Sequence, residues 1–265
     1  MLLAFDVGNT NTVVGVFRDG ALLTNWRLQT ENSKSADEYG MMLKQFFDYE
    51  GFEMKDVDDI IVSTVVPSAL FTLQHMASKY FNTKAIVVEH GLKTGLAVKY
   101  DEPKQVGADR IVNAIAAFEK YGGPLIIIDF GTATTFCAIS ENAEYLGGTI
   151  APGLKISLDA IVERTAQLPK VELEEPGHVI CKNTVQSMQS GLVYGHMGVV
   201  DYILKKMKKE MEELTPSGKP VTVIATGGLA NLMGNGVEGI DFIDKLLTLE
   251  GLARIYELNK DTKQK

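Results

Sequence analysis

Two short stretches of this chain place an acid, a glycine and small polar side chains directly after an apolar run. The first reads Asp6-Val7-Gly8-Asn9-Thr10-Asn11-Thr12 and continues into Val13; the second reads Asp129-Phe130-Gly131-Thr132-Ala133-Thr134-Thr135. Each leads into another apolar run, so each predicts a strand, a tight turn and a second strand. The backbone N–H groups and small polar side chains of such turns can line a phosphate. Two copies indicate a duplicated domain that holds one polyphosphate from both sides.

The glycine and the acid of each copy have an ordinary interpretation beside the functional one. Gly8 and Gly131 would let the backbone approach a ligand closely or take a positive φ, although an ordinary hairpin turn also uses glycine. Asp6 and Asp129 would be costly as unpaired charges at the ends of apolar strands, and a cation would compensate either one. The alternative is that each acid caps its own turn through backbone N–H groups.

The elements that must position these residues follow the same order in both halves of the chain. Apolar alternation and helical spacing predict strands at 2–6, 12–18, 21–29, 59–65 and 85–88, and helices at 35–50, 67–80 and 107–120. The second half repeats the pattern, with strands at 125–129, 134–140, 145–149 and 221–225, and helices at 153–165, 184–213 and 249–258. The turn formers Tyr121-Gly122-Gly123-Pro124 separate the halves, which predicts domains 1–121 and 122–265.

Composition narrows the class of protein. The 265 residues are 45% hydrophobic and 23% charged, as in an ordinary globular protein, and the net charge is −8. An acidic chain without a clustered basic patch argues against a nucleic-acid partner. No apolar run is long enough to span a bilayer and no secretory signal is visible, so we expect a cytoplasmic protein without a membrane partner. The two cysteines, Cys137 and Cys181, lack metal-ligand spacing and are expected to be reduced.

Five motifs together resemble the type III pantothenate kinases of the actin, hexokinase and Hsp70-like superfamily. They are Asp-Val-Gly-Asn-Thr-Asn (6–11), Gly-Ala-Asp-Arg (107–110), Asp-Phe-Gly-Thr-Ala-Thr-Thr (129–135), Gly-Gly-Thr-Ile-Ala-Pro-Gly (147–153) and Thr-Gly-Gly (226–228). The resemblance implies an α/β fold of two duplicated actin- and ribonuclease H-like domains, each a mixed sheet flanked by helices, with the active-site cleft between them. It further implies ATP-dependent phosphorylation of pantothenate to 4′-phosphopantothenate, the first step of coenzyme A synthesis, by a homodimer that needs Mg²⁺ and K⁺ or NH₄⁺.

The resemblance also assigns roles to residues. The phosphates of ATP would be bound by residues 6–13 together with Gly131 and Thr132. The adenosine would lie against Gly227 and Gly228. Asp6 would contact Mg²⁺, directly or through water, and Asp129 the monovalent cation. Asp109 matches the catalytic base, although an acid in the first turn of a helix is commonly only a partner of the helix dipole. The pantothenate contacts would be Tyr100, Gly107, Ala108, Asp109, Arg110 and Thr184.

Other interpretations of the sequence remain open at this stage. Arg110 can form a bidentate contact with a carboxylate or phosphate, or only a surface ion pair. The small and apolar residues at 191–200 suit close helix packing, either in a homodimer interface or within one chain. The same fold also serves other kinases and phosphatases, and a non-enzymatic accessory role in transcription is a further alternative.

Overall fold

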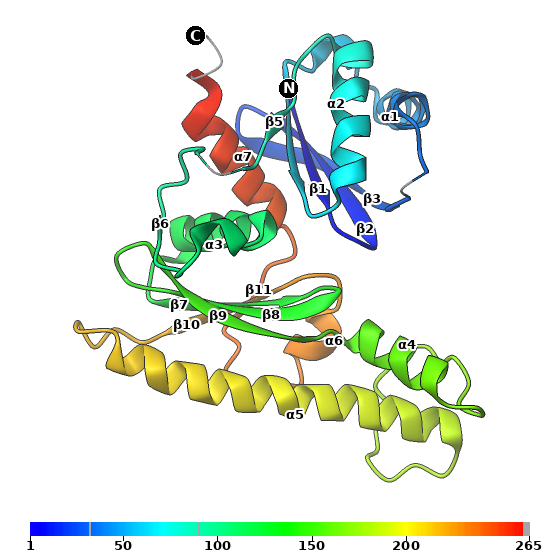
Figure 1. Cartoon of the computed structure of the whole chain (residues 1–265), viewed down its shortest axis with the longest axis vertical. Helices are drawn as coiled ribbons and strands as arrows, with labels where there is room; N and C mark the ends of the chain where they lie inside the picture. The colour runs from blue at the N-terminus through cyan, green and yellow to red at the C-terminus, as the bar shows by residue number, and fades with distance from the viewer. Residues whose placement is uncertain (32, 90, 262–265) are drawn as a thin grey trace. The chain divides into compact units, whose positions relative to one another are not determined.

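The chain forms two compact units in the computed structural model, which describes residues 1–31, 33–89 and 91–261. The first unit contains residues 1–95 and 102–116 and the C-terminal segment from Leu247. The second contains 96–101 and 117–246. Each unit has its own β-sheet (Figure 1).

The first unit is built on a five-stranded mixed sheet. Its strands are β1 (Leu2–Val7), β2 (Asn11–Arg18), β3 (Ala21–Gln29), β4 (Asp59–Thr64) and β5 (Ile86–Val87), in the order β3-β2-β1-β4-β5. The meander β1–β2–β3 is antiparallel, whereas β4 is parallel to β1 and β5 to β4. Asp19 and Gly20 join β2 to β3 with φ of 53° and 81°, the conformation that a type I′ hairpin turn requires.

Helices cover both faces of this sheet. The helices α1 (Ala36–Glu50) and α2 (Pro67–Phe81) pack on the face that carries Leu3, Phe5 and Val7. Because side chains alternate along a strand, Asp6 lies on the opposite face. The helix α7 (Leu247–Asn259) packs on β1, β2 and β4, and α3 (Ala108–Tyr121) runs from the first unit into the second. Short 3₁₀ turns occupy Met54–Asp56 and Pro103–Gln105.

The second unit repeats this topology. It contains β7 (Leu125–Phe130), β8 (Ala133–Ile139), β9 (Glu144–Pro152), β10 (Thr222–Thr226), β11 (Phe242–Ile243) and β6 (Ala97–Val98), in the order β11-β10-β7-β8-β9-β6. The meander β7–β8–β9 is antiparallel and β7–β10–β11 is parallel, so these five strands reproduce the first sheet pair by pair. The helices α4 (Leu154–Arg164), α5 (Thr184–Glu213) and α6 (Ala230–Gly234) complete the unit. The expected duplicated α/β fold is therefore confirmed.

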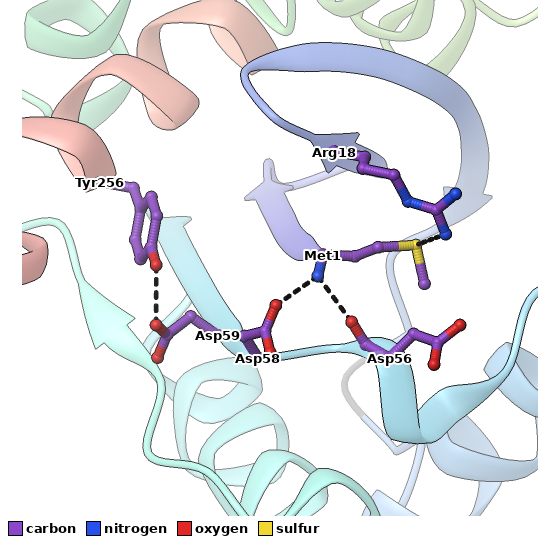
Figure 2. Close-up of polar contacts among 6 residues, drawn as sticks. All are labelled: Met1, Arg18, Asp56, Asp58, Asp59 and Tyr256. Atoms are coloured by element: carbon purple, nitrogen blue, oxygen red, sulfur yellow. Dashed lines mark hydrogen bonds and ion pairs between the residues drawn. The ribbon is translucent and has the colours of Figure 1, made fainter.

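The two units differ from the expected halves of the chain in where their boundaries fall. Residues 96–101 join the second sheet through β6, and α7 returns to the first unit. Figure 2 shows one reason: the Tyr256 hydroxyl donates a 2.8 Å hydrogen bond to Asp59 at the start of β4. Nearby, the Met1 ammonium donates to the Asp56 carbonyl and the Asp58 carboxylate. Local patterns do not reveal on which sheet a terminal helix will pack.

The Tyr256 hydrogen bond should contribute measurably to stability. Burial, with the Asp59 hydrogen bond second, raises the pKa of the Tyr256 phenol, so the hydroxyl remains a donor at neutral pH. Tyr256→Phe should cost about 1 kcal/mol and lower Tm by about 2–4 °C in a thermal melt. Tyr49→Phe, at a side chain that is 88% exposed, is the matched control. Equal Tm values for the two variants would show that this bond does not hold α7.

Candidate functional site

Both strand-terminal acids occupy the same topological position. Asp6 pairs in register with Val13 on β2 and Ser63 on β4, and Asp129 pairs with Thr135 on β8 and Thr226 on β10. Residues paired in register share a face of the sheet. Each half-buried acid therefore lies beside a hydroxyl residue that is only 1% exposed, Ser63 or Thr226.

The first turn is held from behind by the residue that follows β3. The Gly8 N–H donates to the Asn11 carbonyl at 3.0 Å and closes the turn. Thr30 donates its N–H to the Thr10 carbonyl at 3.0 Å and its hydroxyl to the Gly8 carbonyl at 2.8 Å. The side chains of Asn9 and Asn11 are exposed, so polar groups on the other side of the turn face solvent.

Two residues expected at this turn have side chains directed into the protein. Val7 belongs to the core under α1 and α2. Thr12 is fully buried, and its hydroxyl oxygen lies 2.9 Å from that of Thr30. Thr12 and Val7 can therefore serve a ligand only through their backbone, whereas Val13 is half-buried on the face of Asp6.

The second turn is enclosed by two further glycines. A Cβ on Gly153, the residue before α4, would collide with the Thr132 carbonyl, so this backbone packs directly behind the turn. A Cβ on Gly227 would collide with the Asp129 carboxylate. Gly227 has a φ of 94°, whereas neither Gly8 nor Gly131 has a positive φ. The expected alternative of a positive φ at Gly8 or Gly131 is thus wrong, because both turns close with ordinary backbone angles.

A buried histidine supports the second turn from α5. His196 Nε2 lies 2.9 Å from the Thr134 hydroxyl, and the imidazole contacts the edge of the Phe130 ring. Both His196 and Thr134 are buried. Burial lowers the pKa of the His196 imidazole, so it is neutral at physiological pH.

The Gly-Ala-Asp-Arg motif forms the start of α3. The Gly107 carbonyl accepts from the N–H groups of Arg110 and Ile111, and Asp109 lies in the first turn. A Cβ on Gly107 would collide with the Asp109 carboxylate, which therefore folds back over the start of the helix. The Arg110 guanidinium donates to the Gln105 carbonyl at 3.4 Å, which ties it to the preceding turn. Ala108, Asp109 and Arg110 are all half-buried.

The two remaining substrate candidates lie at distant places within the second unit. Tyr100 follows β6 and its ring packs edge-on against Tyr145 and beside Gly147. Thr184 begins α5 and lines an open groove of about 770 Å³ with Cys181, Lys182 and Ile161 of α4. Figure 1 shows β6 and the first turn of α5 at opposite ends of this unit.

The oxygen atoms near each acid suit a hard cation. Ser63 Oγ is buried beside Asp6 and has no hydrogen-bond partner among the residues that the structure describes. Asp129 lies against Gly131 and Gly227, with the buried Thr226 in register. Carboxylate and hydroxyl oxygens are ligands for Mg²⁺ and similar ions. Within the described ranges, no group of three or more His, Cys, Asp or Glu residues forms a metal cluster, and Cys137 and Cys181 are free thiols.

Three supporting residues were not predicted from the sequence: Thr30, Gly153 and His196. Thr30 carries a recoverable signal, because a three-stranded meander must bring the end of its third strand beside the first turn. Gly153 carries the same signal, because it directly follows β9, the third strand of the second meander. Nothing in the sequence around His196 points to its role at the turn, because its partner Thr134 lies far away in the sequence.

Two mixed sheets that share the order of five strands, each with an acid before a polar turn, define a two-domain actin-like fold. A family model described as type III pantothenate kinase matches residues 2–206. The chain therefore belongs to the type III pantothenate kinase family. The Thr226–Gly228 turn lies beyond the matched residues. No helix in the described part of the chain is long and apolar enough to cross a membrane.

Solved structures share the fold over nearly the whole chain. A Campylobacter jejuni protein described as a Baf family transcriptional activator is 22% identical, with a TM-score of 0.53 and coverage of 98% of this chain and 99% of that one. The activator of 2-hydroxyisocaproyl-CoA dehydratase from Clostridium difficile, with bound ADPNP, is 14% identical, with a TM-score of 0.53 and coverage of 100% and 97%. A Sinorhizobium meliloti protein described as a 2-dehydro-3-deoxygalactonokinase is 12% identical, with a TM-score of 0.55 and coverage of 97% and 98%. At these identities the likeness shows the fold alone.

Gly131 and Gly227 should respond differently to alanine. A Cβ on Gly131 would lie 3.4 Å from the nearest atom, so the protein has room for it and only a ligand would meet it. Gly131→Ala should keep the wild-type Tm and raise KM for ATP by about tenfold. Gly227→Ala should lower Tm by about 4 °C or more, because its φ disfavours a side chain and Asp129 must move. A loss of Tm in Gly131→Ala would refute this distinction.

Titration of His196 should make stability depend on pH. Burial lowers its folded-state pKa below the unfolded value of about 6.5, so below that pH the unfolded chain binds more protons. Stability should therefore fall as the pH falls below about 6.5. In His196→Gln, which keeps a polar group near Thr134, the fall in Tm from about pH 7.5 to 5.5 should be smaller. Parallel Tm profiles would exclude this contribution.

Proposed function

We propose that this protein is an ATP-dependent pantothenate kinase, which forms 4′-phosphopantothenate in the first step of coenzyme A synthesis. The observation that carries the proposal is the pair of acid-ended turns at equivalent positions of two equivalent sheets, in a chain of the type III pantothenate kinase family. Phosphoryl transfer requires mainly positioning and charge neutralisation, and polar turns at strand ends provide both.

The first turn is the proposed site for the β- and γ-phosphates. Asn9 and Asn11 are exposed and Thr10 is half-buried, so their polar groups would be available to phosphate oxygens, and Gly8 adds no side chain that would obstruct them. Gly131 and Thr132 would bind phosphate oxygens from the second unit. Gly227 and Gly228 would lie against the adenosine. Gly227 is half-buried and Gly228 is exposed, and neither carries a side chain that would obstruct the ligand. The cleft between the two units stays a prediction.

Asp109 is the proposed general base. Its carboxylate lies at the positively polarised start of α3 and is half-buried, within the motif that also supplies Gly107, Ala108 and Arg110. It would accept the proton of the pantothenate primary hydroxyl as that oxygen attacks the γ-phosphorus and the bond to the bridging oxygen of ADP breaks. Arg110 would hold the pantothenate carboxylate through its planar guanidinium.

Two cations fit the oxygen atoms described above. Asp6, with Ser63 beside it, would hold Mg²⁺ directly or through water, and Asp129, with Thr226 beside it, would hold K⁺ or NH₄⁺. When bound, the ions neutralise charge on the phosphate oxygens. The residues of this chain hold the acids in place: Thr135 and Gly227 flank Asp129, and Val13 flanks Asp6.

A homodimer is the proposed assembly. Along α5, Val193, Met197 and Val200 are buried in the chain's own core, whereas Gly191, Gly195 and Gly198 face open space. Val199 and Tyr202 are exposed beside these glycines. The predicted packing within one chain is therefore found on one face of the helix, and the other face is the proposed homodimer interface. Such a dimer would let Tyr100 of one subunit and Thr184 of the other contact the same pantothenate.

One relative's description favours a second candidate function, a regulatory role in transcription. The net charge of −8 disfavours direct DNA binding, because DNA contacts need clustered positive charge. Other kinases share the fold and would differ in acceptor. The proposed cytoplasmic location agrees with either role.

The first experiment is ADP release from Mg-ATP with pantothenate, with a panel of sugars and with no acceptor, each in K⁺, NH₄⁺ and Na⁺. We expect turnover only with pantothenate, and weaker use of ATP in Na⁺ than in the other two salts. Turnover with a sugar or without an acceptor would contradict the proposed substrate. Equal rates in all three salts would contradict the cation role of Asp129. Light scattering should give the mass of two chains.

Asp109→Asn should lower kcat by about 10²- to 10⁴-fold, the usual contribution of a general base. Binding of an ATP analogue, measured by calorimetry, should change little because the phosphate turns are intact. Asp101→Asn, at an exposed acid outside the motif, serves as the control. Near-normal turnover of Asp109→Asn would remove Asp109 from this role.

A further inference from the structure

Thr30 is the residue that connects the end of the first meander to the polar turn at 8–11. It makes three polar contacts there: with the Gly8 carbonyl, the Thr10 carbonyl and the Thr12 hydroxyl. Its own backbone lies outside the strands, directly after β3. Thr30 is not among the residues assigned to ATP or pantothenate.

The directions of these hydrogen bonds follow from the chemistry of a hydroxyl group. Thr30 has one hydroxyl proton, and it is donated to the Gly8 carbonyl at 2.8 Å. In the 2.9 Å contact between hydroxyls, Thr12 must therefore be the donor and Thr30 the acceptor. One directed chain of hydrogen bonds thus runs from the Thr12 hydroxyl through the Thr30 hydroxyl to the Gly8 carbonyl.

This network fixes the orientation of one peptide group in the turn. The Gly8–Asn9 peptide is trans, since the cis bond of the described chain is at Gly123–Pro124. In a trans peptide the N–H points opposite to the C=O. Because Thr30 holds the Gly8 carbonyl on its own side, the Asn9 N–H is held on the opposite side, where Asn9 and Asn11 are exposed.

We propose that Thr30 is a positioning residue for ATP, which aims the Asn9 N–H and the turn at the phosphates without touching them. The proposal rests on the proposed function, because it assumes that the first turn binds phosphate. Loss of the half-buried Thr30 hydroxyl would leave the Gly8 carbonyl and the Thr12 hydroxyl without this partner, and the peptide could rotate. The effect should fall on ATP and spare pantothenate.

The test compares Thr30→Val, which removes the hydroxyl at constant shape, with Thr30→Ser, which retains it. Thr24→Val is the matched control, because Thr24 lies on β3 and its hydroxyl makes only an exposed contact with Glu50. Calorimetry with the non-hydrolysable analogue AMP-PNP and steady-state kinetics provide two readouts. Thr30→Val should weaken AMP-PNP binding and raise KM for ATP by about 5- to 30-fold. KM for pantothenate should change less than about twofold.

The outcomes separate positioning from a general loss of stability. Thr30→Ser and Thr24→Val should bind AMP-PNP as the wild type does, and Thr30→Ala provides the same measurement if Thr30→Val does not fold. AMP-PNP binding by Thr30→Val equal to that of Thr24→Val would overturn the proposal. Equal losses in Thr30→Val and Thr30→Ser would also overturn it, since the hydroxyl would then be irrelevant.

Failure of the proposed function gives a different result. If the wild type binds AMP-PNP but does not phosphorylate pantothenate, only the acceptor is wrong, and the comparison of AMP-PNP binding still tests Thr30. If the wild type does not bind AMP-PNP at all, both the proposed function and the role of Thr30 are refuted.

Discussion

A carboxylate at the end of a buried strand is stable only when opposite charge or hydrogen-bond donors compensate it. This constraint applies to two residues of the chain, Asp6 and Asp129. They occupy the same register position in two equivalent sheets. In each case the neighbouring parallel strand contributes a buried hydroxyl residue, Ser63 or Thr226. The rest of each unit can be understood as the scaffold that keeps the acid and the following turn in place.

The turns themselves are short, and each is supported by residues from other elements. Thr30 holds the first turn through its hydroxyl and its backbone N–H. In the second unit the position of Thr30, directly after the third strand, is occupied by Gly153, whose backbone packs behind the turn, and His196 adds support through Thr134. Duplication has thus preserved the sheet topology and the acid, while the supports have diverged.

The long helix α5 shows how one element can serve two interfaces. Its buried residues pack against the second sheet, and its glycines lie on the exposed face. Glycine in the middle of an exposed helix is costly, by about 1 kcal/mol relative to alanine. A second helix packed closely on that face would offset this cost, which is the physical argument for the proposed dimer.

The sequence by itself determined the strands, the two acid-ended turns and the duplication, because these depend on local alternation and on turn residues such as Asp19 and Gly20. It also indicated the start of α3 with Asp109, since glycine before a helix is a local signal. Only the tertiary structure decided that α7 returns to the first sheet, that Thr12 faces inward and that Thr30 and His196 support the turns. Those facts depend on contacts between residues distant in the chain, such as Tyr256 with Asp59, and no local pattern encodes which distant partner a side chain will meet.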